Sequence, residues 1–192
     1  ETAIITHLAR RPASGFIQRI VGPAKGAPAD LKGGEALRLY LQQMIGPSWS
    51  PDGRKIVFSG SEGGLSDIYM IDADGKNLTR LTRDAYGDLM PQWSPDGRYV
   101  AFVSERGPQT DLTTLRLGDW RISVLDLEQG SIEVVPDQGG KNLNPMWAPD
   151  GQSIAYISDR TGIPQIFLYD RTEAEHYQLT KFVGGVISLT EH

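Results

Sequence analysis

A fourteen-residue phrase that occurs three times is the feature that most constrains the fold of this chain. It reads PSWSPDGRKIVFSG from Pro47, PQWSPDGRYVAFVS from Pro91 and PMWAPDGQSIAYIS from Pro145, so the copies begin 44 and 54 residues apart. Self-similarity at a fixed period of roughly 20–50 residues is typical of folds that stack one small unit repeatedly. The sequence of 192 residues therefore predicts a repeat protein.

Each copy contains the same turn signal. A tryptophan is followed by Ser/Ala-Pro-Asp-Gly, in which proline presets one backbone angle and glycine accepts the left-handed conformation that leads into a strand. The repeated positions are Trp49, Pro51, Asp52, Gly53, Trp93, Pro95, Asp96, Gly97, Trp147, Pro149, Asp150 and Gly151. We interpret all of them as structural, and we expect the tryptophans to fill the layer between neighbouring units.

The residues after each turn predict three further strands per copy. An alternating run comes first, and the third strands are DIYMIDADG, RISVLDLEQG and QIFLYDRTEA; the fourth are NLTRLT, SIEVVP and HYQLT. Four short antiparallel strands in about 40 residues are typical of one blade of a β-propeller. We therefore predict an all-β chain with blades at 47–90, 91–144 and 145–180, which agrees with its 22 glycines and 12 prolines.

The two ends of the chain are less regular than its middle. Residues 1–46 are interpreted as an N-terminal extension, a linker or a degenerate preceding blade, in which GEALRLYLQQM is either a strand or an amphipathic helix. Residues 181–192 are interpreted as a connector toward a blade that is missing. Because propellers have about four to eight blades, three cannot close a ring. Either two copies pair to supply six blades, or the chain is an arc of a larger ring.

The second copy is longer because of one loop. Between its second and third strands lie sixteen residues, 105–120, where the first copy has seven. Loops that depart from a rigid scaffold often carry binding residues, and tryptophan and arginine are enriched at interfaces. The candidate partner-contact residues are Asp111, Leu115, Arg116 and Trp120. The alternative is an extended hairpin that covers its own blade.

Composition argues against several classes of function. The net charge of −5 gives no basic footprint for nucleic acid, and no apolar run approaches the roughly 20 residues that span a bilayer. The chain has no cysteine, so it cannot use a thiol nucleophile or a disulfide framework. It begins with Glu1 and has no signal-peptide pattern, so we expect a mature protein or an excised piece of a longer one.

Catalytic and metal-binding motifs are also missing from the sequence. There is no G-x-S-x-G elbow, H-E-x-x-H pair or phosphate-binding loop, and we interpret His7, His176 and His192 as surface residues. The DADG at 72–75 resembles the start of a calcium loop, but Arg83 stands where the bidentate glutamate is needed. We expect a hairpin turn there. No cofactor is predicted, and a structural calcium ion on the propeller axis is left open.

The phrase PSWSPDGRKIVFSG, followed by DIYMIDADGKNLTRLT, resembles the TolB-type, WD-like propeller repeat over roughly Gly46 to Thr180. The resemblance implies a non-catalytic module for protein–protein interaction or scaffolding, in a larger exported, periplasmic protein with an unidentified protein partner. The alternative that it implies is the accessory propeller of a peptidase whose catalytic domain is absent from this chain. A third hypothesis, an enzyme with scattered carboxylates in a channel, has no support in the residue spacing.

Overall fold

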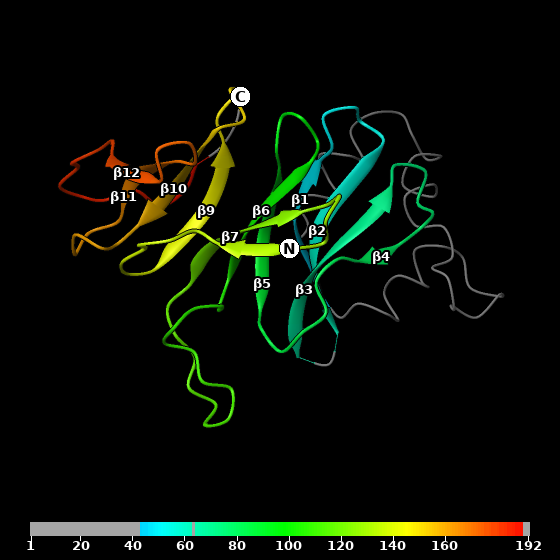
Figure 1. The fold of residues 1–192 in the computed structure, drawn as a ribbon, viewed down its shortest axis with the longest axis horizontal. Coiled ribbons are helices and arrows are strands. Elements are labelled where there is room, and N and C mark those ends of the chain that lie inside the picture. The colour runs from blue at the N-terminus through cyan, green and yellow to red at the C-terminus, as the bar shows by residue number, and fades with distance from the viewer. Residues whose placement is uncertain (1–42, 63, 190–192) are drawn as a thin grey trace.

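The described part of the chain, residues 43–62 and 64–189 of a computed structural model, contains twelve strands and no helix (Figure 1). The first sheet is formed by β1 (Gln43–Trp49), β2 (Lys55–Glu62), β3 (Leu65–Asp72) and β4 (Thr79–Arg80). The second is formed by β5 (Asp88–Trp93), β6 (Tyr99–Ser104), β7 (Arg121–Asp126) and β8 (Ile132–Val134). The third is formed by β9 (Asn142–Trp147), β10 (Ser153–Ser158), β11 (Gln165–Asp170) and β12 (Glu175–Gln178).

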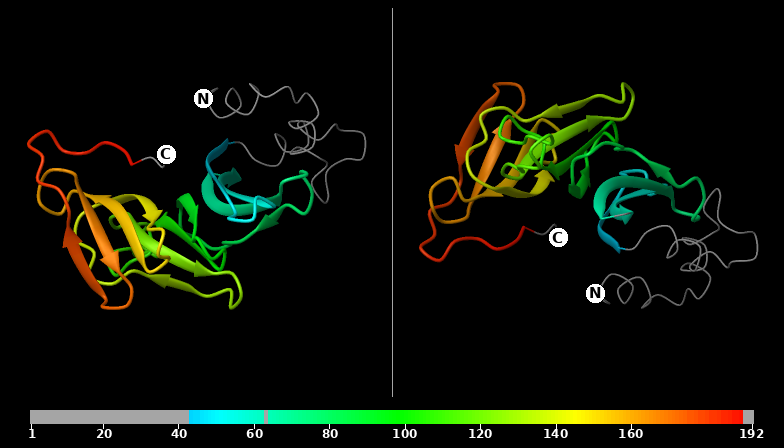
Figure 2. Two further views of the ribbon diagram at one scale, coloured as in Figure 1. Left: turned by 90° about the horizontal axis from the view of Figure 1, so that it is seen from above. Right: turned by 90° about the horizontal axis from the view of Figure 1, so that it is seen from below.

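All three sheets are antiparallel, with strands in sequence order. Their first strands lie side by side: the Trp93 amide of β5 donates to Ser48 Oγ of β1 at 3.2 Å. The other strands fan outward, so the sheets form an arc of stacked blades (Figure 2). The prediction of an all-β chain with three propeller blades is confirmed. Residues 34–42, for which the sequence allows a helix or a strand, lie outside the described residues.

The repeated turn forms through the same hydrogen bonds in the first two blades. Asp52 Oδ1 accepts from the Arg54 amide at 3.0 Å and from Ser50 Oγ at 2.7 Å, and Asp96 makes the corresponding contacts with Arg98 and Ser94. The glycine that follows each aspartate has a left-handed backbone, with φ between 67° and 74° in all three copies. A β-carbon is disfavoured in that conformation, which accounts for the glycine in each phrase.

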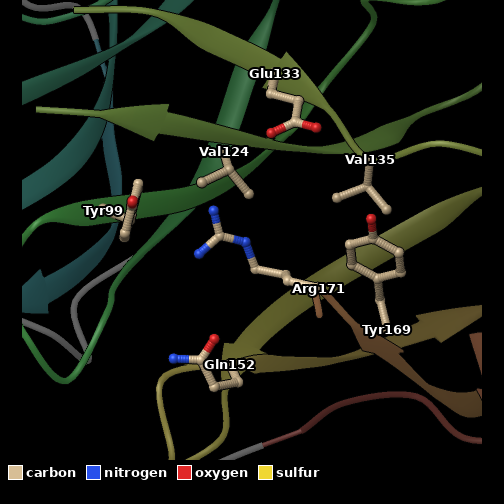
Figure 3. A pocket seen from close by; sticks show the side chains of 7 residues that line it. All are labelled: Tyr99, Val124, Glu133, Val135, Gln152, Tyr169 and Arg171. Atoms are coloured by element: carbon tan, nitrogen blue, oxygen red, sulfur yellow. The ribbon is translucent and has the colours of Figure 1, made fainter. Parts of the chain in front are cut away.

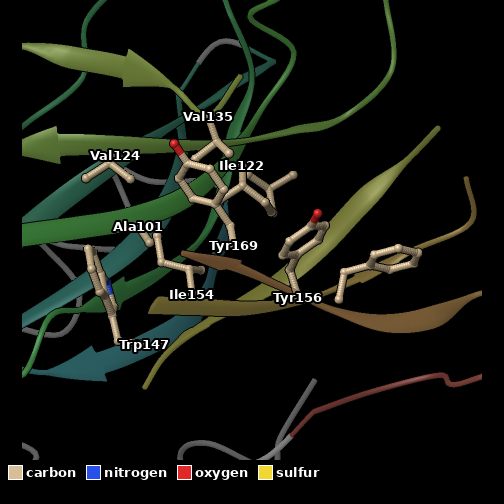
Figure 4. Close-up of a cluster of buried hydrophobic side chains, with 10 residues drawn as sticks. Ala101, Ile122, Val124, Val135, Trp147, Ile154, Tyr156 and Tyr169 are labelled. Carbon is tan, nitrogen blue, oxygen red and sulfur yellow. The ribbon is translucent and has the colours of Figure 1, made fainter. Parts of the chain in front are cut away.

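The core is divided into layers between blades. Trp93 packs between the first and second sheets, against Val57 and Ile68 of the first and Phe102 of the second. Trp147 packs between the second and third sheets in a larger apolar cluster (Figure 4). Trp49, the equivalent residue of the first blade, is 41% exposed, compared with 9% for Trp93. Both inner tryptophans therefore lie where one blade meets the next.

Each first strand also contains a bulge that the repeated phrase does not predict. The pairing register shifts at this point in all three sheets, and the residue before the proline has positive φ: 62° at Gly46, 54° at Met90 and 54° at Asn144. Such bulges bend and twist a strand. Only at the first site is the residue a glycine, so Met90 holds a conformation that costs a non-glycine residue about 1 kcal/mol.

Candidate functional site

The insertion of the second blade is a hairpin that extends beyond the sheets. β6 ends at Ser104 and β7 begins at Arg121, and the loop between them projects from the edge of the arc (Figure 1). Asp111 and Arg116 pair through their backbones, with N–O distances of 2.8 and 2.9 Å. Hydrogen bonds to the carboxylate of Asp111, those from the hydroxyls of Thr113 and Thr114 foremost, lower its pKa. This carboxylate therefore stabilises its own turn.

The tip of this hairpin presents apolar side chains to solvent. Leu115 is 83% exposed and has a left-handed backbone with φ of 55°, and Leu117 is 54% exposed. Arg116 lies between them and is also exposed. Two neighbouring leucines on a projecting loop gain nothing from this chain's own core. Their chemistry suits contact with another apolar surface.

Trp120 lies at the base of the hairpin. It is partly buried and packs against the apolar cluster between the second and third blades. Its carbonyl oxygen accepts hydrogen bonds from the amide and the side-chain nitrogen of Asn142, at 2.9 and 3.1 Å. The fold thus brings Asp111, Leu115 and Arg116 together in the outer part of the loop, whereas Trp120 fixes the loop to the blades.

A buried ion-pair cluster, which sequence reasoning missed, anchors the other end of the hairpin. Arg106 bonds to the carboxylates of Asp84 and Asp88 and, at 2.6 Å, to Ser104 Oγ. The Asp88 side chain is fully buried; burial raises its pKa, and the hydrogen bond from Arg106 opposes that rise. Beside it, Asp67 pairs with Arg80. The two aspartates that bond to Arg106 are 18 and 22 residues from it in sequence, and no spacing rule joins them.

Two other kinds of feature are absent from the described ranges. No three or more histidine or acidic side chains of residues 43–62 and 64–189 come together in a way that could hold a metal ion. In the same ranges, the structure contains no helix with the length and apolar character that crossing a membrane requires.

Stacked four-stranded sheets whose first strands converge define this chain as part of a β-propeller. The TolB beta propeller domain family matches residues 34–117. A Chlorobium luteolum protein named as a TolB homolog is 29% identical over 150 residues, 62% of this chain and 34% of that protein. The structure of TolB from Acinetobacter baumannii has a TM-score of 0.58 and 27% identity over 70% of this chain and 32% of its own. The three sheets are propeller blades, and the chain is similar to TolB-type propellers.

Two further similarities limit the functional conclusions that the relatives support. An uncharacterized protein of Agrobacterium fabrum is 40% identical over 116 residues, 58% of this chain and 39% of that protein. The chain thus spans little more than a third of the curated relatives it matches. A puromycin hydrolase structure aligns with 78% of this chain at a TM-score of 0.56 and 16% identity, which shows a shared fold alone.

Proposed function

We propose that this chain is a non-catalytic TolB-like propeller module that binds a protein partner through the insertion hairpin of its second blade. The observation that carries the proposal is the pair of exposed leucines, Leu115 and Leu117, on a loop that is fixed at both ends. A rigid base lowers the entropy lost when a loop binds, which favours a preorganised contact. The resemblance to TolB supports a protein partner and a location outside the cytoplasm.

The test is affinity capture from an envelope extract with matched surface variants. Leu115→Ser combined with Leu117→Ser removes the apolar tip and leaves the anchoring residues unchanged. Ile163→Ser is the control, because Ile163 is 42% exposed in the corresponding loop of the third blade. We expect the tip variant to lose a protein that the wild type and the control both retain. Equal recovery by all three proteins would refute a contact at the hairpin tip.

The proposal includes self-association through the third blade. Leu179 occupies in the third blade the position that Val135 occupies in the second. The Leu179 amide donates to the Ile166 carbonyl at 2.8 Å, and the Val135 amide donates to the Ile122 carbonyl at 3.0 Å. Val135 is 4% exposed beneath the next blade, whereas Leu179 is 55% exposed. A second copy could cover this face and complete a ring. Light scattering over a dilution series should then give twice 21.1 kDa, and a concentration-independent monomer would contradict it.

A second candidate function is that of an accessory propeller in a peptidase. Its support is the partial coverage of the relatives, together with the shared fold of the puromycin hydrolase structure. Determining the complete reading frame would separate the candidates. A hydrolase domain in that frame would favour the accessory function, and a frame holding only propeller blades would favour the interaction module.

A further inference from the structure

A polar pocket of about 270 Å³ lies between the second and third blades, well away from the insertion hairpin (Figure 3). Tyr99 at its edge is the first residue of β6, whereas the hairpin follows the last residue of that strand. Two valines, Val124 and Val135, form its apolar wall. Its polar lining consists of Tyr99, Glu133, Gln152, Tyr169 and Arg171.

The guanidinium of Arg171 is held inside this pocket by aromatic rings. Its central carbon is 4.4 Å from the centre of the Tyr99 ring and 5.3 Å from that of Trp147. These two rings stack on each other at 6.1 Å. Among the described residues no carboxylate forms an ion pair with Arg171, and its side chain donates no hydrogen bond. The aromatic rings therefore hold its five N–H donors in place, and these donors are available to a ligand.

The other polar groups of the pocket are equally available. Within residues 43–62 and 64–189 no protein hydrogen bond involves the carboxylate of Glu133, the side-chain amide of Gln152 or the hydroxyl of Tyr169. Glu133 and Arg171 point into the same space from opposite blades without pairing with each other (Figure 3). The pocket thus presents one fixed positive group and one negative group, with neutral polar groups around them.

The repeat supplies an internal control for this arrangement. At the corresponding place between the first and second blades, Leu127 makes the backbone hydrogen bond that Arg171 makes here. Leu127 and Ile132 pack there against the apolar cluster that contains Leu125. The polar pocket is therefore no requirement of the blade architecture. It arises from substitutions that are specific to the second interface.

We propose that this pocket binds a small zwitterion of the α-amino acid class, free in solution. Arg171 receives the carboxylate through charge-assisted hydrogen bonds, and Glu133 accepts from the ammonium group. Gln152 and the tyrosine hydroxyls supply further hydrogen bonds, and the valines limit the size of the side chain. The pocket volume fits a ligand with a short side chain. This inference does not depend on the partner proposed for the hairpin.

NMR titrations of the whole chain with three probes test the inference: glycine, acetate and methylamine. The readout is the shift of the backbone amides of Arg171 and Gln152. We expect saturable binding of glycine, with acetate weaker by at least about tenfold and methylamine weaker still. No saturable shift with glycine, or equal affinity for glycine and acetate, would overturn the zwitterion assignment.

Variants identify which group makes which contact. Arg171→Leu introduces the residue type found at the corresponding position of the second blade and should abolish binding of glycine and acetate. Glu133→Gln should reduce glycine affinity to that of acetate and leave acetate unchanged. Arg54→Leu removes an exposed arginine at the position of the first blade that corresponds to Gln152, and should change nothing. Glycine binding that survives Arg171→Leu would overturn the proposal.

Discussion

The two interfaces between blades share a backbone and differ in chemistry. In the first interface, between the first and second blades, Leu127 donates its amide to the Arg98 carbonyl and its side chain joins an apolar cluster. In the second, Arg171 donates its amide to Gln152 in the same way, but its side chain is charged and lies against Tyr99. The repeated phrase therefore determines the strand positions, and the residues that differ between the copies determine what each interface does.

The two interfaces also differ at the end of the blades that carries the insertion. There the first interface is charged: Arg106 lies between Asp84 and Asp88. The equivalent of Arg106 in the third blade is Arg160, which donates to Tyr156 Oη at 2.6 Å and stacks on an aromatic ring. Asn142 replaces Asp88 there. At this end Arg106 thus pairs with two carboxylates, whereas Arg160 forms no ion pair among the described residues.

The largest expected effect comes from removing the arginine of the charged cluster. Arg106→Ala leaves Asp88 fully buried without its charge partner, and breaking a buried ion pair costs about 3–5 kcal/mol. Arg160→Ala removes hydrogen bonds to two neutral hydroxyls, those of Tyr156 and Ser158, and should cost about 1–2 kcal/mol. Urea unfolding of the two variants measures both costs. Equal losses would show that the buried carboxylate contributes nothing to the difference between the interfaces.

The inner tryptophans give a smaller test of the same comparison. Trp147 Nε1 donates to the Gln92 carbonyl at 3.2 Å, whereas the buried Nε1 of Trp93 has no hydrogen-bond partner among the described residues. Replacing either residue by phenylalanine removes a similar apolar area and keeps a ring for the contacts of Trp147 with Tyr99 and Arg171, so the difference between the variants reports chiefly on the hydrogen bond. We expect Trp147→Phe to cost about 1 kcal/mol more than Trp93→Phe. Thermal and urea unfolding of the two variants measure this difference. A larger loss for Trp93→Phe than for Trp147→Phe would contradict a stabilising role of the hydrogen bond from Trp147.

Much of the fold could be predicted because it repeats. Three copies of Trp-x-Pro-Asp-Gly define three turns, and the alternating runs after them define strands, since a period of two determines which face is buried. The contacts of Arg106 could not be predicted, because its partners Asp84 and Asp88 reach it through tertiary packing. Arg171 could have been singled out. Aligning the copies places a charge where the second blade has Leu127, and a charge in an interface layer is a signal for a site.

His176 provides a pH-dependent test that is specific to the second interface. Its ring nitrogens lie 2.8 Å from the Pro136 carbonyl oxygen and 2.8 Å from Tyr156 Oη. The neutral ring satisfies both contacts, donating to the carbonyl and accepting from the hydroxyl. Burial lowers the pKa of His176 below its usual 6.5, and the charge of Arg160 acts in the same direction. It is thus a half-buried structural residue and not the surface histidine that the sequence suggested.

Because the folded state disfavours the protonated ring, the contribution of His176 is fully present above pH 6.5 and is lost as the pH falls below that value. We expect the free energy of unfolding to decline with acidification through this range. In His176→Ile, which introduces the residue type of the matching Ile132, this part of the decline should vanish. Urea unfolding midpoints of the two proteins from about pH 8 to about pH 5 measure this difference in pH dependence. His7 and His192 are present in both proteins, so their contributions cancel in the comparison. Parallel pH profiles for the two proteins would contradict the prediction.

Arg171→Leu should have the smallest effect on stability. It gives the second interface the apolar side chain of the first, and replaces cation–π contacts worth about 0.5–1 kcal/mol at exposed sites by apolar packing of similar size. We expect the free energy of unfolding to change by less than about 1 kcal/mol, as measured by urea unfolding beside the control Arg54→Leu. A loss above about 2 kcal/mol would show that the guanidinium holds the two blades together. A near-neutral result would instead mean that the charge contributes little to the fold, as expected of a group available to a ligand.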